Sequence, residues 1–159
     1  MSRTRQHKYD VRTVWDGAAQ GPIRDYPSYS REYAIEIAGK PRLQASADAT
    51  FRGDDTLHNP EDLLVAALSG CHLLSYLAVC ALKGVQVVAY QDDAIGIMEE
   101  SAGAGRYTVV TLHPKVTLAA GSDAELAAAL HDEAHKICFV ANSVNFPVKN
   151  EPVIEVAGP

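Results

Sequence analysis

The chain has 159 residues, a length typical of one domain whose core needs no disulfide support. Its 47% hydrophobic and 21% charged residues are those of an ordinary soluble globular protein, and a net charge of -6 without clustered Lys and Arg argues against nucleic-acid binding. Three cysteines, an odd number, favour reduced thiols in the cytoplasm over a secreted disulfide framework. The basic segment 1–8, which we expect to be flexible, precedes no apolar stretch, and no continuous apolar run reaches roughly 18 residues. We therefore expect neither a secretory signal nor a membrane protein.

The first part of the chain has the patterning of a small antiparallel sheet. Apolar and polar residues alternate in three short segments, and the turn Gly39-Lys40-Pro41 joins the second to the third. The expected elements are a strand at 11–15, a loop at 21–30, a strand at 31–37, a strand at 43–47 and an irregular segment at 48–58.

A long helix is predicted next. Its start carries an N-cap residue, a first-turn proline and two acidic residues that suit the positive end of the helix dipole: Asn59, Pro60, Glu61 and Asp62. Apolar residues then recur every three or four positions with few charges, and Gly84 supplies the stop. We expect a helix at about 60–82 that is buried nearly all round.

The second half alternates strands with one further helix. The expected elements are a strand region at 85–98, an acidic turn at 99–105, a strand at 107–118, a helix at 124–140, and strands at 144–147 and 153–156. No repeat or linker interrupts this order, so we expect one α+β domain over 1–159 with antiparallel sheet.

The three cysteines lie in different settings. Cys80 belongs to an apolar run in which a small side chain fills space, and we interpret it as a core residue. Cys71 lies midway along the first helix and Cys138 at the end of the second. A thiol inside an apolar helix is inert unless a cation or a hydrogen-bond donor favours its thiolate. The first helix has no cation before its last turn, so an activating cation must come from elsewhere; the candidates are Arg24, Arg31, Arg42, Arg52 and Arg106.

Glu61 precedes Cys71 by ten residues, which is about 15 Å along a helix. The two side chains therefore cannot touch within one straight helix. If they share a site, either the helix is broken between them or Glu61 of one subunit faces Cys71 of another. The alternative is that Glu61 only complements the helix dipole.

Three motifs, taken together, resemble the OsmC/Ohr family, the osmotically inducible and organic hydroperoxide resistance proteins. They occur in family order and at family-like separation from Tyr9 to Val156: Asn59-Pro60-Glu61-Asp62-Leu63-Leu64, Ala66-Ala67-Leu68-Ser69-Gly70-Cys71-His72, and Ala134-His135-Lys136-Ile137-Cys138 with Asn142-Ser143. The resemblance implies an OsmC-like α+β fold, with antiparallel sheets wrapped around two long central helices in an intertwined homodimer.

The resemblance also implies a thiol-dependent peroxidase that acts on hydroperoxides without a metal or organic cofactor. Cys71 matches the peroxidatic cysteine, Cys138 the resolving cysteine and Glu61 the glutamate of the family motif. The family's arginine matches Arg31 best by position, with Arg24 as the alternative. Arg31, oriented by Glu61, would favour the Cys71 thiolate, and a Cys71–Cys138 disulfide would form and be reduced by a dithiol, in the family a lipoylated protein.

The chain departs from the members specialised for organic hydroperoxides at the residues that follow the two cysteines. His72 stands where an aromatic residue is usual, and Phe139 where proline is usual. His72 points about 100° away from Cys71 around the helix, whereas His135 shares the face of Cys138 and could tune its thiol. The apolar residues Leu64, Leu68 and Leu74 are compatible with a pocket that prefers organic peroxides.

Two hypotheses from other classes stay open. In one, His131, His135 and Cys138, spaced along one face of the second helix, form part of a zinc site that lacks an evident fourth ligand. In the other, the chain is a non-catalytic dimeric binding protein for a small apolar or sulfur-containing ligand.

Overall fold

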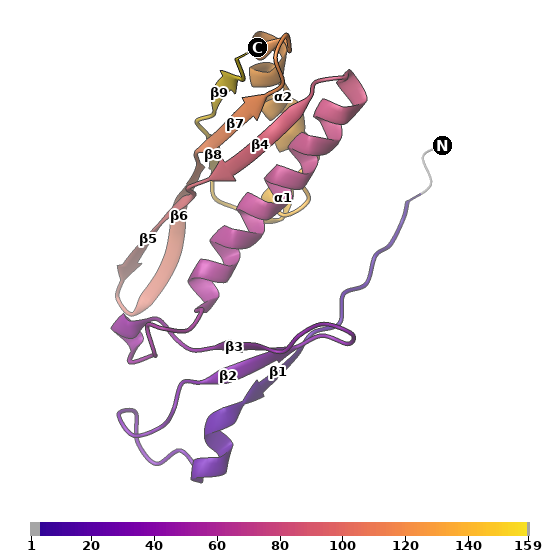
Figure 1. Ribbon diagram of the computed structural model, residues 1–159. Helices are drawn as coiled ribbons and strands as arrows, with labels where there is room; N and C mark the ends of the chain where they lie inside the picture. The colour runs from indigo at the N-terminus through magenta and orange to yellow at the C-terminus, as the bar shows by residue number, and fades with distance from the viewer. Residues whose placement is uncertain (1–3, 159) are drawn as a thin grey trace. The chain divides into compact units, whose positions relative to one another are not determined.

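The computed structural model describes residues 4–158 as an α+β protein with two helices and several sheets (Figure 1). The chain divides into two compact units, with the boundary after Leu63. The prediction that 1–8 is flexible falls partly on residues 1–3, which lie outside the described range. The described residues 4–8 are exposed and have no regular secondary structure.

The N-terminal unit is built on a three-stranded antiparallel sheet in the order β1-β2-β3. Its strands are β1 (Arg12–Trp15), β2 (Tyr33–Glu36) and β3 (Leu43–Ala45). Short 3-10 helices occupy Asp16–Gln20 and Ala49–Phe51. The three predicted strands are confirmed, each shorter than expected, because the pairing stops where the loops begin.

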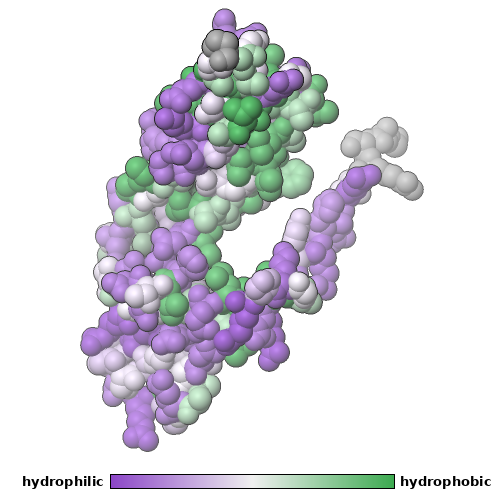
Figure 2. All heavy atoms as spheres, viewed as in Figure 1, coloured by the Kyte–Doolittle hydropathy of each residue, from purple (hydrophilic) through white to green (hydrophobic). Residues whose placement is uncertain are grey.

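Helix α1 (Pro60–Lys83) begins and ends where the capping signals place it. The Asn59 side chain accepts a hydrogen bond from the backbone N–H of Asp62 at 2.8 Å, and Gly84 ends the helix with a φ of 76°. The expectation that α1 is buried nearly all round is wrong for the single chain. Leu74 is 69% exposed and Leu82 84% exposed, and Figure 2 shows apolar residues gathered on the C-terminal unit along the side where α1 lies.

By length and composition alone α1 could also cross a membrane, since its hydropathy reaches 2.0. The expectation that no continuous apolar run reaches roughly 18 residues still holds, because Ser69, Gly70, His72 and Ser75 interrupt the apolar residues of the helix. The core helix of a soluble protein passes the same test, so the finding is weak evidence for a membrane span.

The C-terminal unit holds two further three-stranded sheets, in the orders β4-β7-β9 and β5-β6-β8. Their strands are β4 (Val87–Asp92), β5 (Ile95–Ser101), β6 (Ala104–Leu112), β7 (Pro114–Leu118), β8 (Val148–Asn150) and β9 (Val153–Val156). The pairs β4-β7 and β5-β6 are antiparallel as expected, whereas β8 and β9 join their sheets in parallel, which the sequence did not predict.

Four predicted segments in this unit also differ from the structure. The expected strand region 85–98 is split, because β4 and β5 belong to different sheets, and the expected strand 107–118 is split in the same way between β6 and β7. The acidic turn is tighter than expected, since β5 and β6 pair down to Ser101 and Ala104. The expected strand at 144–147 is wrong, because that segment is irregular and the strand β8 follows it at Val148–Asn150.

Helix α2 (Ala124–Ile137) begins at Asp123, whose side chain accepts a hydrogen bond from the backbone N–H of Leu126 at 2.9 Å. It ends three residues before the predicted end at 140, because Cys138 leaves the helix with extended backbone angles and a 3-10 turn follows at Ala141–Ser143. Both helices pack on the β4-β7-β9 sheet, in a core to which they contribute Tyr76, Val79, Cys80, Ala127, Leu130 and Ala134. Leu68 packs instead in a second core, with Val110 and Leu112 of β6.

Candidate functional site

The two thiols predicted to act together lie in contact in the C-terminal unit. Cys71 projects from α1 and is half-buried, whereas Cys138 caps the C-terminus of α2 and is 1% exposed. Their side chains share a hydrogen bond, and both are free thiols. The fold therefore brings together two cysteines from distant parts of the chain.

Burial raises the pKa of the Cys138 thiol from 9.0 to about 11, and the hydrogen bond with Cys71 adds to this shift. The backbone N–H groups of Val140 and Ala141 act in the opposite direction. Cys138 is therefore a protonated thiol at neutral pH, in contact with the thiol of Cys71.

Cys80 lies in the core, as predicted. It is 1% exposed, and burial raises the pKa of its thiol, while the hydrogen bond with Tyr76 acts the other way. Its side chain packs in the core between the two helices and the β4-β7-β9 sheet, which leaves it outside the thiol pair.

A pair of buried histidines lies between the same two helices. His72 Nε2 and His131 Nδ1 are 3.0 Å apart, and burial lowers the pKa of each to about 4. The sequence analysis predicted that His72 lies on a different face of the helix from Cys71, but it predicted no partner for His72. The position of His131 on the inner face of the second helix could have indicated one.

The zinc hypothesis for the second helix gains no support. Within residues 4–158 no group of three or more His, Cys, Asp or Glu side chains is arranged to hold a metal ion. His131 is instead engaged with His72, and its ring stacks on Tyr76 at 3.8 Å between centroids.

Arg31 and Glu61 belong to the N-terminal unit, and the structure does not place that unit relative to the thiols. The guanidinium of Arg31 donates hydrogen bonds to the backbone carbonyls of Tyr26 and Tyr29 and lies 3.8 Å from the centroid of the Tyr29 ring. Burial raises the pKa of Tyr33, and the negative charge of Glu61 raises it further. Glu61 therefore interacts electrostatically with Tyr33 of strand β2. The pairing of Arg31 with Cys71 stays a prediction.

The alternative arginine, Arg24, lies in an exposed loop. Arg31 in contrast lines an open pocket of about 380 Å³ together with Arg52 and Glu32. The rings of Tyr26 and Tyr29 and two backbone carbonyls hold the guanidinium of Arg31 in place.

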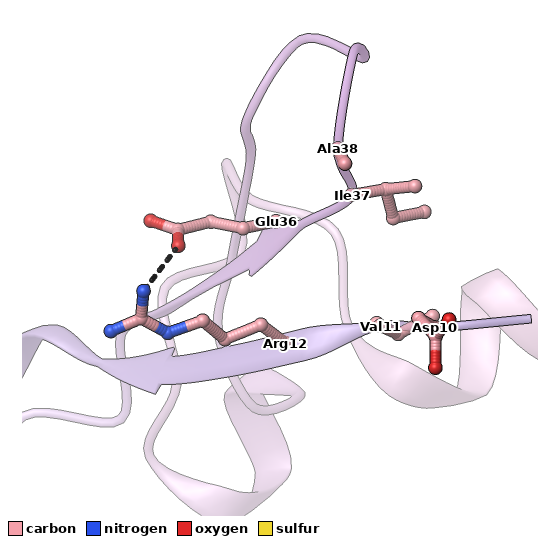
Figure 3. Close-up of a pocket in the computed structure, with 6 residues that line it drawn as sticks. All are labelled: Asp10, Val11, Arg12, Glu36, Ile37 and Ala38. Carbon is pink, nitrogen blue, oxygen red and sulfur yellow. Dashed lines mark ion pairs between the residues drawn. The ribbon is translucent and has the colours of Figure 1, made fainter.

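Another open pocket of the N-terminal unit, of about 440 Å³, lies beside β1 (Figure 3). It is lined by Asp10, Val11, Arg12, Glu36, Ile37 and Ala38. Arg12 and Glu36 form an ion pair across the two strands at 3.6 Å, and none of the predicted site residues lines this pocket.

The leucines proposed to form an apolar substrate pocket do not share one environment. Leu68 is fully buried in the second core, and Leu74 is largely exposed. The expectation of a pocket built from both is therefore wrong for the single chain, since one side chain lies in the core and the other is exposed to solvent.

These features define an α+β protein whose two helices present a pair of interacting thiols. Residues 53–152 match the family model for OsmC-like proteins, and the chain belongs to this family. The resemblance drawn from the sequence motifs is thereby confirmed.

Solved structures agree on the fold. An OsmC-like protein of unknown function from Vibrio cholerae is 28% identical, with a TM-score of 0.80 over 93% of this chain and 100% of that chain. Organic hydroperoxide resistance proteins from Legionella pneumophila and Elizabethkingia anophelis are each 16% identical with TM-scores of 0.69, over 96% and 98% of this chain and 100% of their own. No curated protein matches the chain.

Proposed function

We propose that the chain is a cysteine-based peroxidase that reduces organic hydroperoxides. The observation that carries the proposal is the contact between the half-buried Cys71 and the buried Cys138. Relatives of the same fold that are named organic hydroperoxide resistance proteins support this class of activity.

Cys71 is the thiol that meets the peroxide, since it is the more accessible of the two. Its thiolate attacks one peroxide oxygen, the O–O bond breaks, and the alkoxide takes up a proton and leaves as an alcohol. The sulfur is oxidised to a sulfenic acid and the peroxide is reduced by two electrons. A positive charge near the leaving oxygen would lower the barrier, and Arg31 is our candidate for it.

Cys138 then resolves the sulfenic acid. Its sulfur bonds to the sulfur of Cys71, and the hydroxyl of the sulfenic acid leaves with a proton as water. A dithiol, which in the family is a lipoylated protein, reduces the disulfide by exchange and is itself oxidised. Because Cys138 is buried and protonated, it avoids direct oxidation while Cys71 is reduced.

We also propose that the working unit is a homodimer in the cytoplasm. The exposed apolar face of α1, with Leu74 and Leu82, is the surface that a second copy would cover. If Glu61 shares a site with Cys71, we propose that Glu61 of one subunit faces Cys71 of the other; the alternative is that Glu61 only complements the dipole of α1 (Pro60–Lys83). The same dimer would give Glu61 its role in orienting Arg31.

A titration of free thiols tests the proposal. The reduced protein is treated with cumene hydroperoxide, and the thiols that remain are counted. We expect the loss of two thiols per chain in the wild type and in Cys80→Ala, the matched control, with no disulfide in Cys71→Ser or Cys138→Ser. Thiols that survive excess peroxide would refute the peroxidase and leave the binding protein as the remaining hypothesis.

The substrate class has its own test, because His72 and Phe139 replace the residues usual in the organic hydroperoxide specialists. Phe139 is 73% exposed beside Cys138. Comparing the rates with cumene hydroperoxide and with hydrogen peroxide gives the preference, and Phe139→Pro should shift it if this side chain helps to select the substrate.

A further inference from the structure

The buried histidine pair lies next to the thiols on both helices. His72 follows Cys71 directly on α1, and His131 lies two turns before Cys138 on α2. The two rings are 1% and 2% exposed and lie nearly parallel, with 5.3 Å between centroids. The hydrogen bond between them therefore joins the same two elements that the thiol contact joins.

Stability alone does not explain this pair. The outer ring nitrogens, His72 Nδ1 and His131 Nε2, are buried without a hydrogen-bond partner among the described residues. Leaving a buried polar atom unpaired costs about 1–3 kcal/mol, whereas one hydrogen bond contributes a net of about 0.5–1.5 kcal/mol. Two apolar side chains of similar size would hold the helices together at least as well.

What the hydrogen bond adds is a fixed register. Apolar side chains can slide past one another, but a bond between two named nitrogens permits one alignment of α1 against α2. His131 is further fixed by its stack on Tyr76, whose hydroxyl donates to the carbonyl of Ala127 at 3.0 Å. Two residues of α1, His72 and Tyr76, therefore hold the ring of His131, and Tyr76 is itself bonded to α2.

Disulfide formation is sensitive to such alignment. The Cα atoms of two bonded cysteines lie about 4.4–6.8 Å apart, and a shift of about 1 Å in the reacting groups can change a rate by about 100-fold. Cys71 and Cys138 meet only if α1 and the end of α2 keep their relative position.

We infer that His72 and His131 form a positioning pair that holds α1 and α2 in the register in which Cys71 and Cys138 bond. The pair acts through the helices and does not touch the peroxide. The inference rests on the proposed function in so far as this disulfide is its intermediate, but it concerns the two thiols themselves and is testable without peroxide.

The experiment is a redox titration of the Cys71–Cys138 disulfide in glutathione buffers. Oxidised glutathione accepts two electrons from the two thiols, which gives the protein disulfide and two reduced glutathione molecules. We expect His131→Leu to lower the equilibrium constant for disulfide formation at least tenfold, a shift of about 30 mV. Asp132→Leu, the same change at the exposed neighbouring position, should leave the constant unchanged.

Rescue separates positioning from packing. Asn can place a hydrogen-bonding atom where His131 Nδ1 lies, so His131→Asn should recover most of the lost constant, while His72→Leu combined with His131→Leu should be no worse than either change alone. Thermal melts establish that each variant is folded, and His131→Asn carries the test if the leucine variant is not.

Three outcomes would overturn the inference. They are a wild-type constant in His131→Leu, equally low constants in His131→Asn and His131→Leu, and wild-type thiols that never bond in oxidised glutathione. If the disulfide behaves as expected but cumene hydroperoxide leaves the thiols intact, the peroxidase proposal fails and the positioning pair stands.

Discussion

The thiol of Cys138 should react far more slowly in the native protein than in the unfolded chain. Cys138 is 1% exposed, and burial together with its hydrogen bond to Cys71 raises the pKa of its thiol from 9.0 to about 11. Two pKa units reduce the thiolate fraction at neutral pH about 100-fold, and only the thiolate reacts with an alkylating agent. The native protein should therefore alkylate at Cys138 at least about 100-fold more slowly than the unfolded protein does.

A pulse of iodoacetamide at pH 7, followed by mass spectrometry of the cysteine peptides, measures this ratio in native protein and in urea. The native rate at Cys138 should rise about tenfold per pH unit until the pH approaches 11. Cys71→Ala removes the part of the shift that Cys71 causes, so the rate should increase but stay below that of the unfolded chain, because burial is the larger cause. A native rate within tenfold of the unfolded rate would refute the assignment of Cys138 as the protected thiol.

Three further predictions follow from the buried histidines, the arginine and the exposed helix face. Burial lowers the pKa of His72 and His131 from 6.5 to about 4, so their contribution to stability is present above pH 6.5 and is lost as the pH falls toward 4. Urea unfolding at pH 6.5 and at pH 4 should show a lower free energy of unfolding at pH 4. The difference should be smaller in the variant in which both histidines are leucine. If Arg31 activates the first thiol, Arg31→Ala should slow its alkylation at neutral pH much more than Arg24→Ala does, and the reverse order would move the role to Arg24. Leu74→Asp should shift the protein from dimer to monomer by light scattering, since burying one leucine contributes about 1.5–3 kcal/mol, and an unchanged dimer would place the interface elsewhere.

The elements whose signals are local were predictable from the sequence. Asn59 and Gly84 mark the ends of α1 because capping depends only on neighbouring backbone groups, and Asp123 marks the start of α2 for the same reason. The end of α2 was predicted too late, because apolar residues continue past Cys138 while the backbone has already left the helix. Hydrophobic periodicity reports the buried face and does not report the last hydrogen bond of a helix.

The sheets were less predictable because strand pairing depends on distant segments. The alternation of 107–118 was visible in the residue pattern, but its division into β6 and β7, which belong to different sheets, was not. The parallel partners β8 and β9 arrive only after α2, and short strands carry no signal of their direction. The exposure of Leu74 was missed for a related reason: an apolar pattern predicts burial without specifying whether the same chain or a second one provides it.

The candidate site shows the same limit in its chemistry. Cys80 and Cys138 are equally buried at 1% exposed, and burial raises the pKa of both thiols. Burial alone therefore does not distinguish a structural cysteine from a resolving one. The distinction lies in the neighbour, because Cys80 meets the hydroxyl of Tyr76, which has no redox chemistry to offer, whereas Cys138 meets the thiol of Cys71. That contact spans two helices far apart in the chain, and neither helix encodes it in its own periodicity. The protected thiol gains its function from the register of α1 against α2, so the groups that fix this register belong to the chemistry as much as the sulfur atoms do.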